Sequence, residues 1–208
     1  MPSASPPAAP TIVHLLERNA RIHADRPACY DKLSGSWVAT SWRDLDAATR
    51  TFGRALVAGG VDAGDVVTIL GANRPEWTIA ALGAMRVGAI AAGIYTSSSP
   101  DEIAYILHHG ESKLVVVEDA DLLERVRAVW DRVPSLATVV LMRGAEGPGG
   151  DERILTWDEF AARAEGVDNA ELDRRRDALR ADQVADFIYT SGTTGPPKAV
   201  MLTHENLR

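Results

Sequence analysis

The strongest constraint on the fold is a repeated alternation between short apolar runs and helical patterns. The runs cover residues 66–70, 90–94, 114–117 and 138–142. They are almost continuously apolar, as strands are when a parallel sheet is covered on both faces. Parallel neighbours also need long crossover connections, and most stretches between the runs can form a helix. The sequence therefore predicts an α/β fold with a doubly wound, mostly parallel sheet flanked by helices.

Helix starts are marked by residues that cap free backbone N–H groups. A serine or threonine followed three residues later by glutamate forms a capping box, and proline suits the first helical position. The expected caps are Thr11, Ser41, Asn73, Ser99, Thr156 and Thr203, and a helix over 121–133 should stop before Pro134. Apolar segments at 28–30 and 37–39 flank Gly35 and predict a small hairpin.

The chain divides into four parts by composition. After Met1, residues 2–10 are Pro, Ala and Ser, and the segment 1–10 is predicted to be a disordered tail. Residues 11–165 form the α/β subdomain, and the polar stretch 166–185 is a connector. Residues 186–208 begin the next subdomain, and the strand at 186–190 lies either in the same sheet or in another.

A loop suited to phosphate follows that strand. Residues 189–198 read YTSGTTGPPK. Glycines let backbone N–H groups approach an anion, hydroxyls add donors, and lysine adds a cation. The pattern fits neither the Walker loop nor the dinucleotide fingerprint nor the G-x-S-x-G nucleophile elbow. The competing interpretation is a tight surface turn.

The stretch 189–207, YTSGTTGPPKAVMLTHENL, closely resembles the signature of the AMP-forming acyl-activating ligases. This superfamily includes acyl- and aryl-CoA synthetases and peptide-synthetase adenylation domains. The segments GANRPEW at 71–77 and GIYTSSSP at 93–100 resemble the long-chain fatty acyl-CoA synthetases most. One departure is Ala199, where the family usually carries glycine. The resemblance runs from about residue 11 to Arg208 and identifies the chain as an N-terminal portion.

The resemblance implies a function and a binding site. An enzyme of this type activates a fatty acid as acyl-AMP and transfers the acyl group to CoA, using ATP and Mg²⁺. The expected phosphate-binding residues are Thr190, Ser191, Gly192, Thr193, Thr194, Gly195 and Lys198. No residue is assigned to catalysis or to a metal. His108 and His109 are adjacent on one helix and make a poor metal pair, and for His204 a structural role is favoured over a phosphate-facing one.

Composition supports a globular chain that does not bind nucleic acid. The formal net charge is −7, whereas a nucleic-acid surface needs clustered Lys and Arg. The apolar stretch 77–95 carries Arg86 at its middle, which argues against a membrane span. Cys29 is the only cysteine. The expected setting is the cytoplasm, with peripheral membrane contact left open.

Two alternatives stay open. The chain could be a non-catalytic nucleotide-binding or interaction module from a truncated gene, or a relative of the aryl-CoA ligases or adenylation domains. In the family, the groups that hold adenine, ribose, the acyl chain and the catalytic lysine all lie beyond the signature loop. We therefore expect the 208-residue chain alone to be inactive.

Overall fold

A seven-stranded sheet forms the centre of the protein. The computed structural model describes residues 9–33, 35–144, 150–190 and 196–208. The strand order is β7-β6-β5-β3-β4-β8-β9, and every neighbouring pair is parallel except β8 and β9. The sheet strands are β3 (Val66–Leu70), β4 (Ile90–Ile94), β5 (Ser112–Val117), β6 (Thr138–Leu141), β7 (Ile154–Thr156), β8 (Val184–Thr190) and β9 (Lys198–Thr203).

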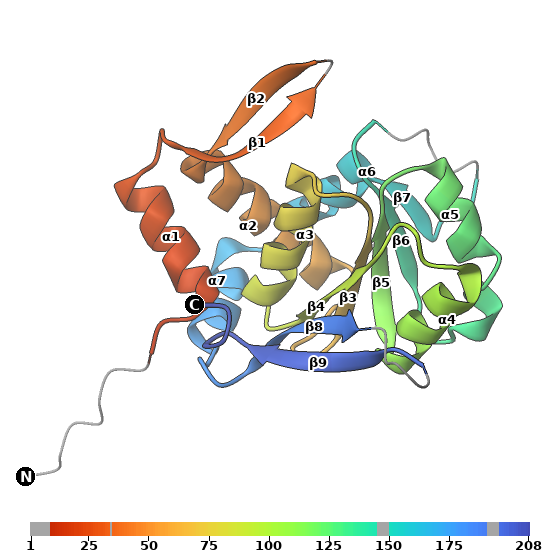
Figure 1. Ribbon diagram of the computed structural model, residues 1–208. Coiled ribbons are helices and arrows are strands. Elements are labelled where there is room, and N and C mark those ends of the chain that lie inside the picture. The colour runs from red at the N-terminus through yellow and green to blue at the C-terminus, as the bar shows by residue number, and fades with distance from the viewer. Residues whose placement is uncertain (1–8, 34, 145–149, 191–195) are drawn as a thin grey trace, which may run out of the picture.

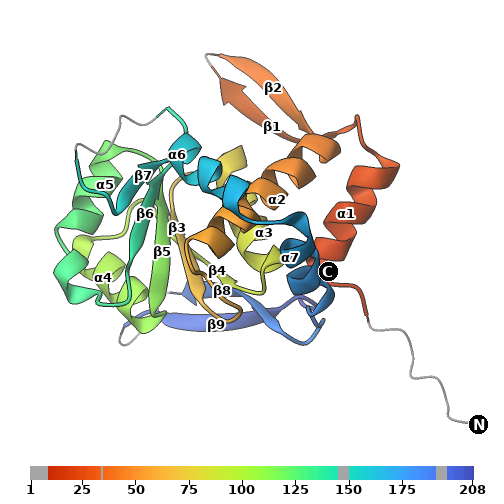
Figure 2. The ribbon, with the colours of Figure 1, turned by 180° about the vertical axis from the view of Figure 1, so that it is seen from behind.

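Helices cover both faces of this sheet, as expected for a doubly wound fold (Figures 1 and 2). Alternate strand residues supply two cores: Val67 and Ile69 of β3 face one side, and Val66 and Leu70 face the other. The first core packs against α1 (Ile12–Ile22), α2 (Trp42–Ala58), α3 (Pro75–Arg86), α6 (Trp157–Ala162) and α7 (Asn169–Asp177). The second packs against α4 (Pro100–His109) and α5 (Ala120–Arg127).

Most expected helix caps are confirmed. Thr11, Ser99 and Thr156 each form a capping box, and Ser41 accepts a bond from the backbone of Asp44. The prediction for Asn73 was wrong. Because Pro75 occupies the first helical position, Arg74 is the residue before the helix, and its side chain makes no capping bond.

The predictions for two other segments need correction. The helix expected over 121–133 ends at Arg127, and a separate 3₁₀ turn covers Trp130–Arg132. No helix begins after Thr203, where a turn is closed by hydrogen bonds between Thr203 and Asn206.

The C-terminal segment belongs to the central sheet. Strand β8 pairs with β4 in parallel, matching Ala91 with Asp186 and Gly93 with Ile188. This settles the open question about 186–190, since its strand extends the same sheet rather than starting another. The division of the chain at 165 and 186 stays a prediction, and most of the tail over 1–10 lies outside the described residues.

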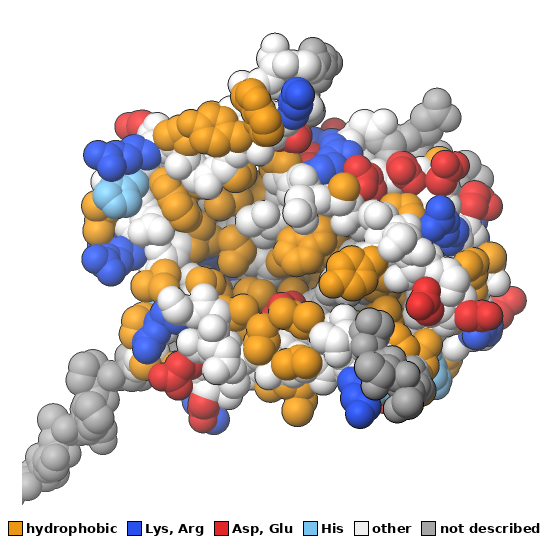
Figure 3. All heavy atoms as spheres, in the orientation of Figure 1, with side chains coloured by type: hydrophobic (Ala, Val, Ile, Leu, Met, Phe, Trp, Pro, Cys, Tyr) orange, Lys and Arg blue, Asp and Glu red, His pale blue; other side chains and the backbone are white. Residues whose placement is uncertain are grey.

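Exposed large hydrophobic side chains fall into two groups (Figure 3). One group lies around a separate hairpin, formed by β1 (Pro27–Leu33) and β2 (Ser36–Ser41) as the sequence predicted. The other lies at the β4, β8 and β9 side of the sheet. In the first group are Ile22, Tyr30, Trp37 and Val38, and in the second Tyr95, Ile188, Val200 and Met201.

Candidate functional site

The topology opens a crevice where β3 and β4 end. The chain leaves β3 toward α3 on one face of the sheet and leaves β4 toward α4 on the other face. Ligands in doubly wound proteins bind at such a divergence, at the carboxyl ends of the strands. A cavity of about 540 Å³ lies here. It is lined by Gly71, Ala72, Asn73, Trp77, Gly93, Ile94, Tyr95, Thr96, Asp186, Phe187, Ile188 and Tyr189.

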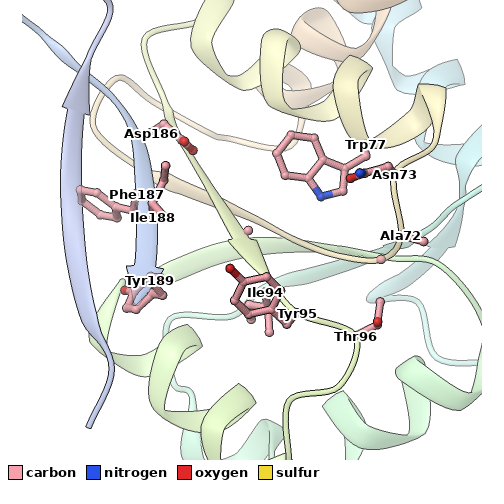
Figure 4. A pocket seen from close by; sticks show the side chains of 12 residues that line it. Ala72, Asn73, Trp77, Ile94, Tyr95, Thr96, Asp186, Phe187, Ile188 and Tyr189 are labelled. Carbon is pink, nitrogen blue, oxygen red and sulfur yellow. The ribbon is translucent and has the colours of Figure 1, made fainter. Parts of the chain in front are cut away.

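A glycine in β4 keeps this cavity open. Gly93 lies between Ile69 and Ile188 in the register of the sheet. A Cβ atom at Gly93 would lie 3.3 Å from Cζ2 of Trp77, a distance at which the indole would have to shift. Trp77 of α3 forms one wall, and Asp186 and Ile188 of β8 lie across the space from it (Figure 4).

Asp186 is the acidic side chain of the cavity wall. Burial raises the pKa of its carboxyl to about 6, against the lesser, opposing effect of a backbone hydrogen bond from Phe187. A carboxylate kept in such surroundings costs stability at neutral pH, and perturbed carboxyls of this kind are frequent at functional sites. Asp186 was not among the residues expected to form the site.

Replacing Asp186 by asparagine should stabilise the chain at neutral pH. The carboxyl titrates near 3.8 when unfolded and near 6 when folded, so folding loses stability as pH rises through this range. Partial exposure reduces the effect, and we expect Asp186→Asn to raise the free energy of unfolding by about 1–2 kcal/mol at pH 8. Urea unfolding measures this gain, which should shrink toward zero near pH 4. A matched change at the exposed Asp182 should show no such gain, and an equal gain there would contradict the burial argument.

The two described ends of the signature loop face each other. Thr190 ends β8, Lys198 begins β9, and the two residues are direct partners across the antiparallel pair. The Thr190 hydroxyl donates a long hydrogen bond of 3.5 Å to the Lys198 carbonyl, and both residues are exposed. The structure therefore brings the first and last expected phosphate-binding residues together at the carboxyl end of β8. Ser191, Gly192, Thr193, Thr194 and Gly195 lie outside the described residues.

Tyr189 fixes the strand end from which the loop starts. Its ring is buried, its hydroxyl lies 3.1 Å from Nδ1 of His109, and it also donates at 3.5 Å to the carbonyl of Ile106. Burial raises the pKa of Tyr189 to about 12, so the phenol is neutral and can donate. This anchor ties β8 to the end of α4. The sequence marked Tyr189 only as the start of the signature.

His204 lies at the other end of β9 from Lys198. The two residues are six positions apart along extended chain, or about 20 Å. The imidazole is 1% exposed, and neither ring nitrogen has a partner among the described residues. Burial, with a smaller effect from His14, lowers the pKa of His204 to about 4. A structural role is thus favoured over the phosphate-facing role.

Folding should become weaker below pH 6.5 because of His204. The pKa of His204 is 6.5 in the unfolded chain and about 4 in the folded chain. Between these pH values the unfolded state binds a proton that the folded state does not, so acidification favours unfolding. Between pH 8 and pH 5 this costs about 2 kcal/mol. Comparing urea unfolding of the unchanged chain and His204→Asn at both pH values isolates this contribution. If the two chains lose the same stability on acidification, His204 is not the cause.

The described residues offer no ready metal site. Among them, no group of three or more His, Cys, Asp or Glu side chains is placed to hold an ion. His108 and His109 are both exposed, and the ring of His109 also stacks on Tyr105 and contacts Tyr189.

Comparisons with known proteins define the family. The sequence profile of the AMP-binding enzyme family matches residues 16–208, and the chain belongs to this family. It is 33% identical to the long-chain-fatty-acid–CoA ligase heimdall of Drosophila melanogaster in an alignment of length 204 that covers 95% of this chain and 30% of that protein. It is 31% identical to the long-chain-fatty-acid–CoA ligase ACSBG2 of Xenopus laevis, covering 95% and 26%. The chain therefore spans less than a third of the length of these curated relatives.

Solved structures agree with the fold. The crystal structure of the anthranilate CoA ligase AuaEII in complex with anthranoyl-AMP superposes with a TM-score of 0.74 at 26% identity, covering 97% of this chain and 36% of that one. The α/β fold and the family resemblance inferred from the signature are thus confirmed.

Proposed function

We propose that the chain provides the ATP-phosphate-binding part of an AMP-forming fatty acyl-CoA ligase. The observation that carries this proposal is the opposition of Thr190 and Lys198 across β8 and β9, at the carboxyl end of the sheet and beside the cavity at the β3–β4 divergence. The loop joining these two residues has the donors and the cation that a polyphosphate needs.

The chemistry requires charge stabilisation rather than an activated side-chain nucleophile. A carboxylate oxygen of the fatty acid attacks the α-phosphorus of ATP, the bond to the bridging oxygen breaks, and pyrophosphate leaves. The thiolate sulfur of CoA then attacks the acyl carbon of acyl-AMP, and AMP leaves with the electrons of the broken bond. Lys198 and the loop donors hold the β- and γ-phosphates, where negative charge builds up as pyrophosphate departs.

ATP, CoA and Mg²⁺ are the expected partners. Mg²⁺ binds mainly through nucleotide phosphates and water rather than through an all-protein cage. Among the described residues, no group of three or more His, Cys, Asp or Glu side chains is placed to hold an ion, and no residue is assigned to Mg²⁺. When bound, Mg²⁺ would neutralise part of the phosphate charge.

A fatty acid is the favoured carboxylate. The curated relatives described above are long-chain-fatty-acid–CoA ligases at 31–33% identity, whereas the aryl ligase is 26% identical. An aryl acid remains the second candidate. The test supplies the complete enzyme with ATP, Mg²⁺, CoA and either long-chain fatty or aryl acids. The proposal requires AMP and pyrophosphate, and release of ADP and inorganic phosphate would contradict it.

The 208-residue chain alone should not form acyl-adenylate at an ordinary enzymatic rate. Much of the rate acceleration comes from groups that position the α-phosphate against the acid. Contacts to the β- and γ-phosphates alone do not provide this positioning. Pyrophosphate release with ATP, Mg²⁺ and fatty acids should stay far below about 1 s⁻¹. Turnover at or above that rate would show that the site needs nothing more than this chain.

A cytoplasmic setting with peripheral membrane contact is also proposed. Within the part of the chain that the structure describes, no helix has the length and apolar character to cross a bilayer.

A further inference from the structure

The hairpin of β1 and β2 projects from the body of the protein, apart from the central sheet (Figures 1 and 2). It carries two aromatic side chains that are largely in water: Tyr30 is 59% and Trp37 is 68% exposed. Aromatic residues of this size are normally well covered in a folded protein. Their exposure on a protruding element indicates a surface that meets a partner.

The register of the hairpin puts these aromatic groups on one face together with a cation. Tyr30 is opposite Ala39, and Lys32 is opposite Trp37, so all four side chains share a face. Nζ of Lys32 lies 6.0 Å from the centroid of the Trp37 ring. We call Tyr30, Lys32 and Trp37 the aromatic face. Tryptophan, tyrosine and lysine side chains that share one face are typical of protein surfaces that lie at the boundary between lipid headgroups and acyl chains.

The segment from Arg18 to Arg43, which includes the hairpin, is basic, whereas the chain as a whole is acidic. Residues 18–43 hold five basic side chains, Arg18, Arg21, Arg26, Lys32 and Arg43, against two acidic ones, Asp25 and Asp31. The whole chain has a net charge of −7, so the remainder carries ten more acidic than basic groups. Of the two acids, Asp25 pairs with Arg43 at 3.0 Å. An anionic surface would attract this end and repel the rest, which sets an orientation.

We propose that the aromatic face of the hairpin docks the protein on an anionic lipid surface. The aromatic rings insert at headgroup depth while Lys32 and the neighbouring arginines meet lipid phosphates. This inference rests on the proposed function and names the surface for its peripheral membrane contact. The second exposed group, at β8 and β9, is less suitable because it adjoins the cavity and the signature loop.

Vesicle co-sedimentation tests the proposal, using phosphatidylglycerol–phosphatidylcholine vesicles and pure phosphatidylcholine vesicles without ATP or acid. We expect binding to the anionic vesicles that weakens steeply in high salt. Trp37→Ser should reduce the affinity about tenfold. Lys32→Gln should reduce it about fivefold on anionic vesicles alone. The matched control is Met201→Ser, which removes a side chain of similar exposure (65%) on β9.

Thermal unfolding of each variant serves as the control for folding. We expect all variants to fold, because the altered side chains are exposed. No vesicle binding, or equal binding by the unchanged chain and Trp37→Ser, overturns the proposal, and so does an equal loss in Met201→Ser. If the unchanged chain binds no lipid but forms a dimer that Trp37→Ser abolishes, the aromatic face binds a second copy of the chain instead. Because no substrate is present, this result is independent of ligase activity.

Discussion

Replacing Arg86 by methionine should lower the free energy of unfolding by about 3–5 kcal/mol. Arg86 lies at the end of α3 and is fully buried. Its guanidinium donates to Glu17 of α1 at 2.6 Å and also bonds Asp46 and Thr49 of α2. The substitution fills similar space but leaves Asp46 without its buried cation, while Glu17 keeps ion pairs with Arg50 at 3.6 Å and Arg176 at 3.3 Å. Urea unfolding at neutral pH measures the loss.

A surface arginine provides the matched control. Arg180 pairs with Asp182 at 2.9 Å, but both side chains are about two-thirds or more exposed. Arg180→Met should therefore cost at most about 1 kcal/mol. If Arg86→Met and Arg180→Met lower the free energy of unfolding by the same amount, the buried ion pairs of Arg86 add nothing to stability. The helices α1, α2 and α3 would then be held together by apolar packing alone. The stability loss for Arg86→Lys should lie between those of the two methionine variants, because an ammonium group cannot make all the hydrogen bonds of the planar guanidinium.

Arg86 also shows where sequence reasoning reached its limit. Its position in an apolar stretch correctly argued against a membrane span, but nothing nearby in the sequence identified Glu17 and Asp46 as its partners. Those partners are 69 and 40 residues away. Only the packing of α1, α2 and α3 brings the three groups together, and that packing depends on long-range contacts that local patterns do not encode.

Local sequence patterns predicted the strands and helix starts well, because the interactions that form them join residues close together in the sequence. The buried runs became parallel strands, and the capping boxes at Ser99 and Thr156 formed as expected. Asn73 failed as a cap for an equally local reason, the proline two residues later. The cavity was missed because its walls, Trp77, Gly93 and Asp186, come from three separated segments. Two signals were available: the segments 71–77 and 93–100, noted only for their resemblance, supply most of the lining, and Gly93 is a glycine inside an apolar strand, which often marks close approach of another group.

Replacing Lys198 by alanine should slow adenylate formation by the complete ligase roughly ten- to hundredfold. A hydrogen bond to a charged group contributes about 1.5–3 kcal/mol, and each 1.36 kcal/mol changes a rate tenfold. The lysine begins β9 directly opposite Thr190, so its loss leaves the strand pairing intact while removing a cation from the loop. Pyrophosphate exchange measures this first half-reaction.

The second half-reaction separates a phosphate role from a structural one. Attack of CoA on supplied acyl-AMP no longer involves pyrophosphate, so Lys198→Ala should leave its rate nearly unchanged. Lys198→Arg keeps the charge and should recover part of the first step, because its cation can still reach the phosphates. Equal losses in both steps would mean that Lys198 supports the fold of the β8–β9 pair. A selective loss in the first step would place the β- and γ-phosphates beside Thr190 and Lys198, where the two strands bring the ends of the loop together.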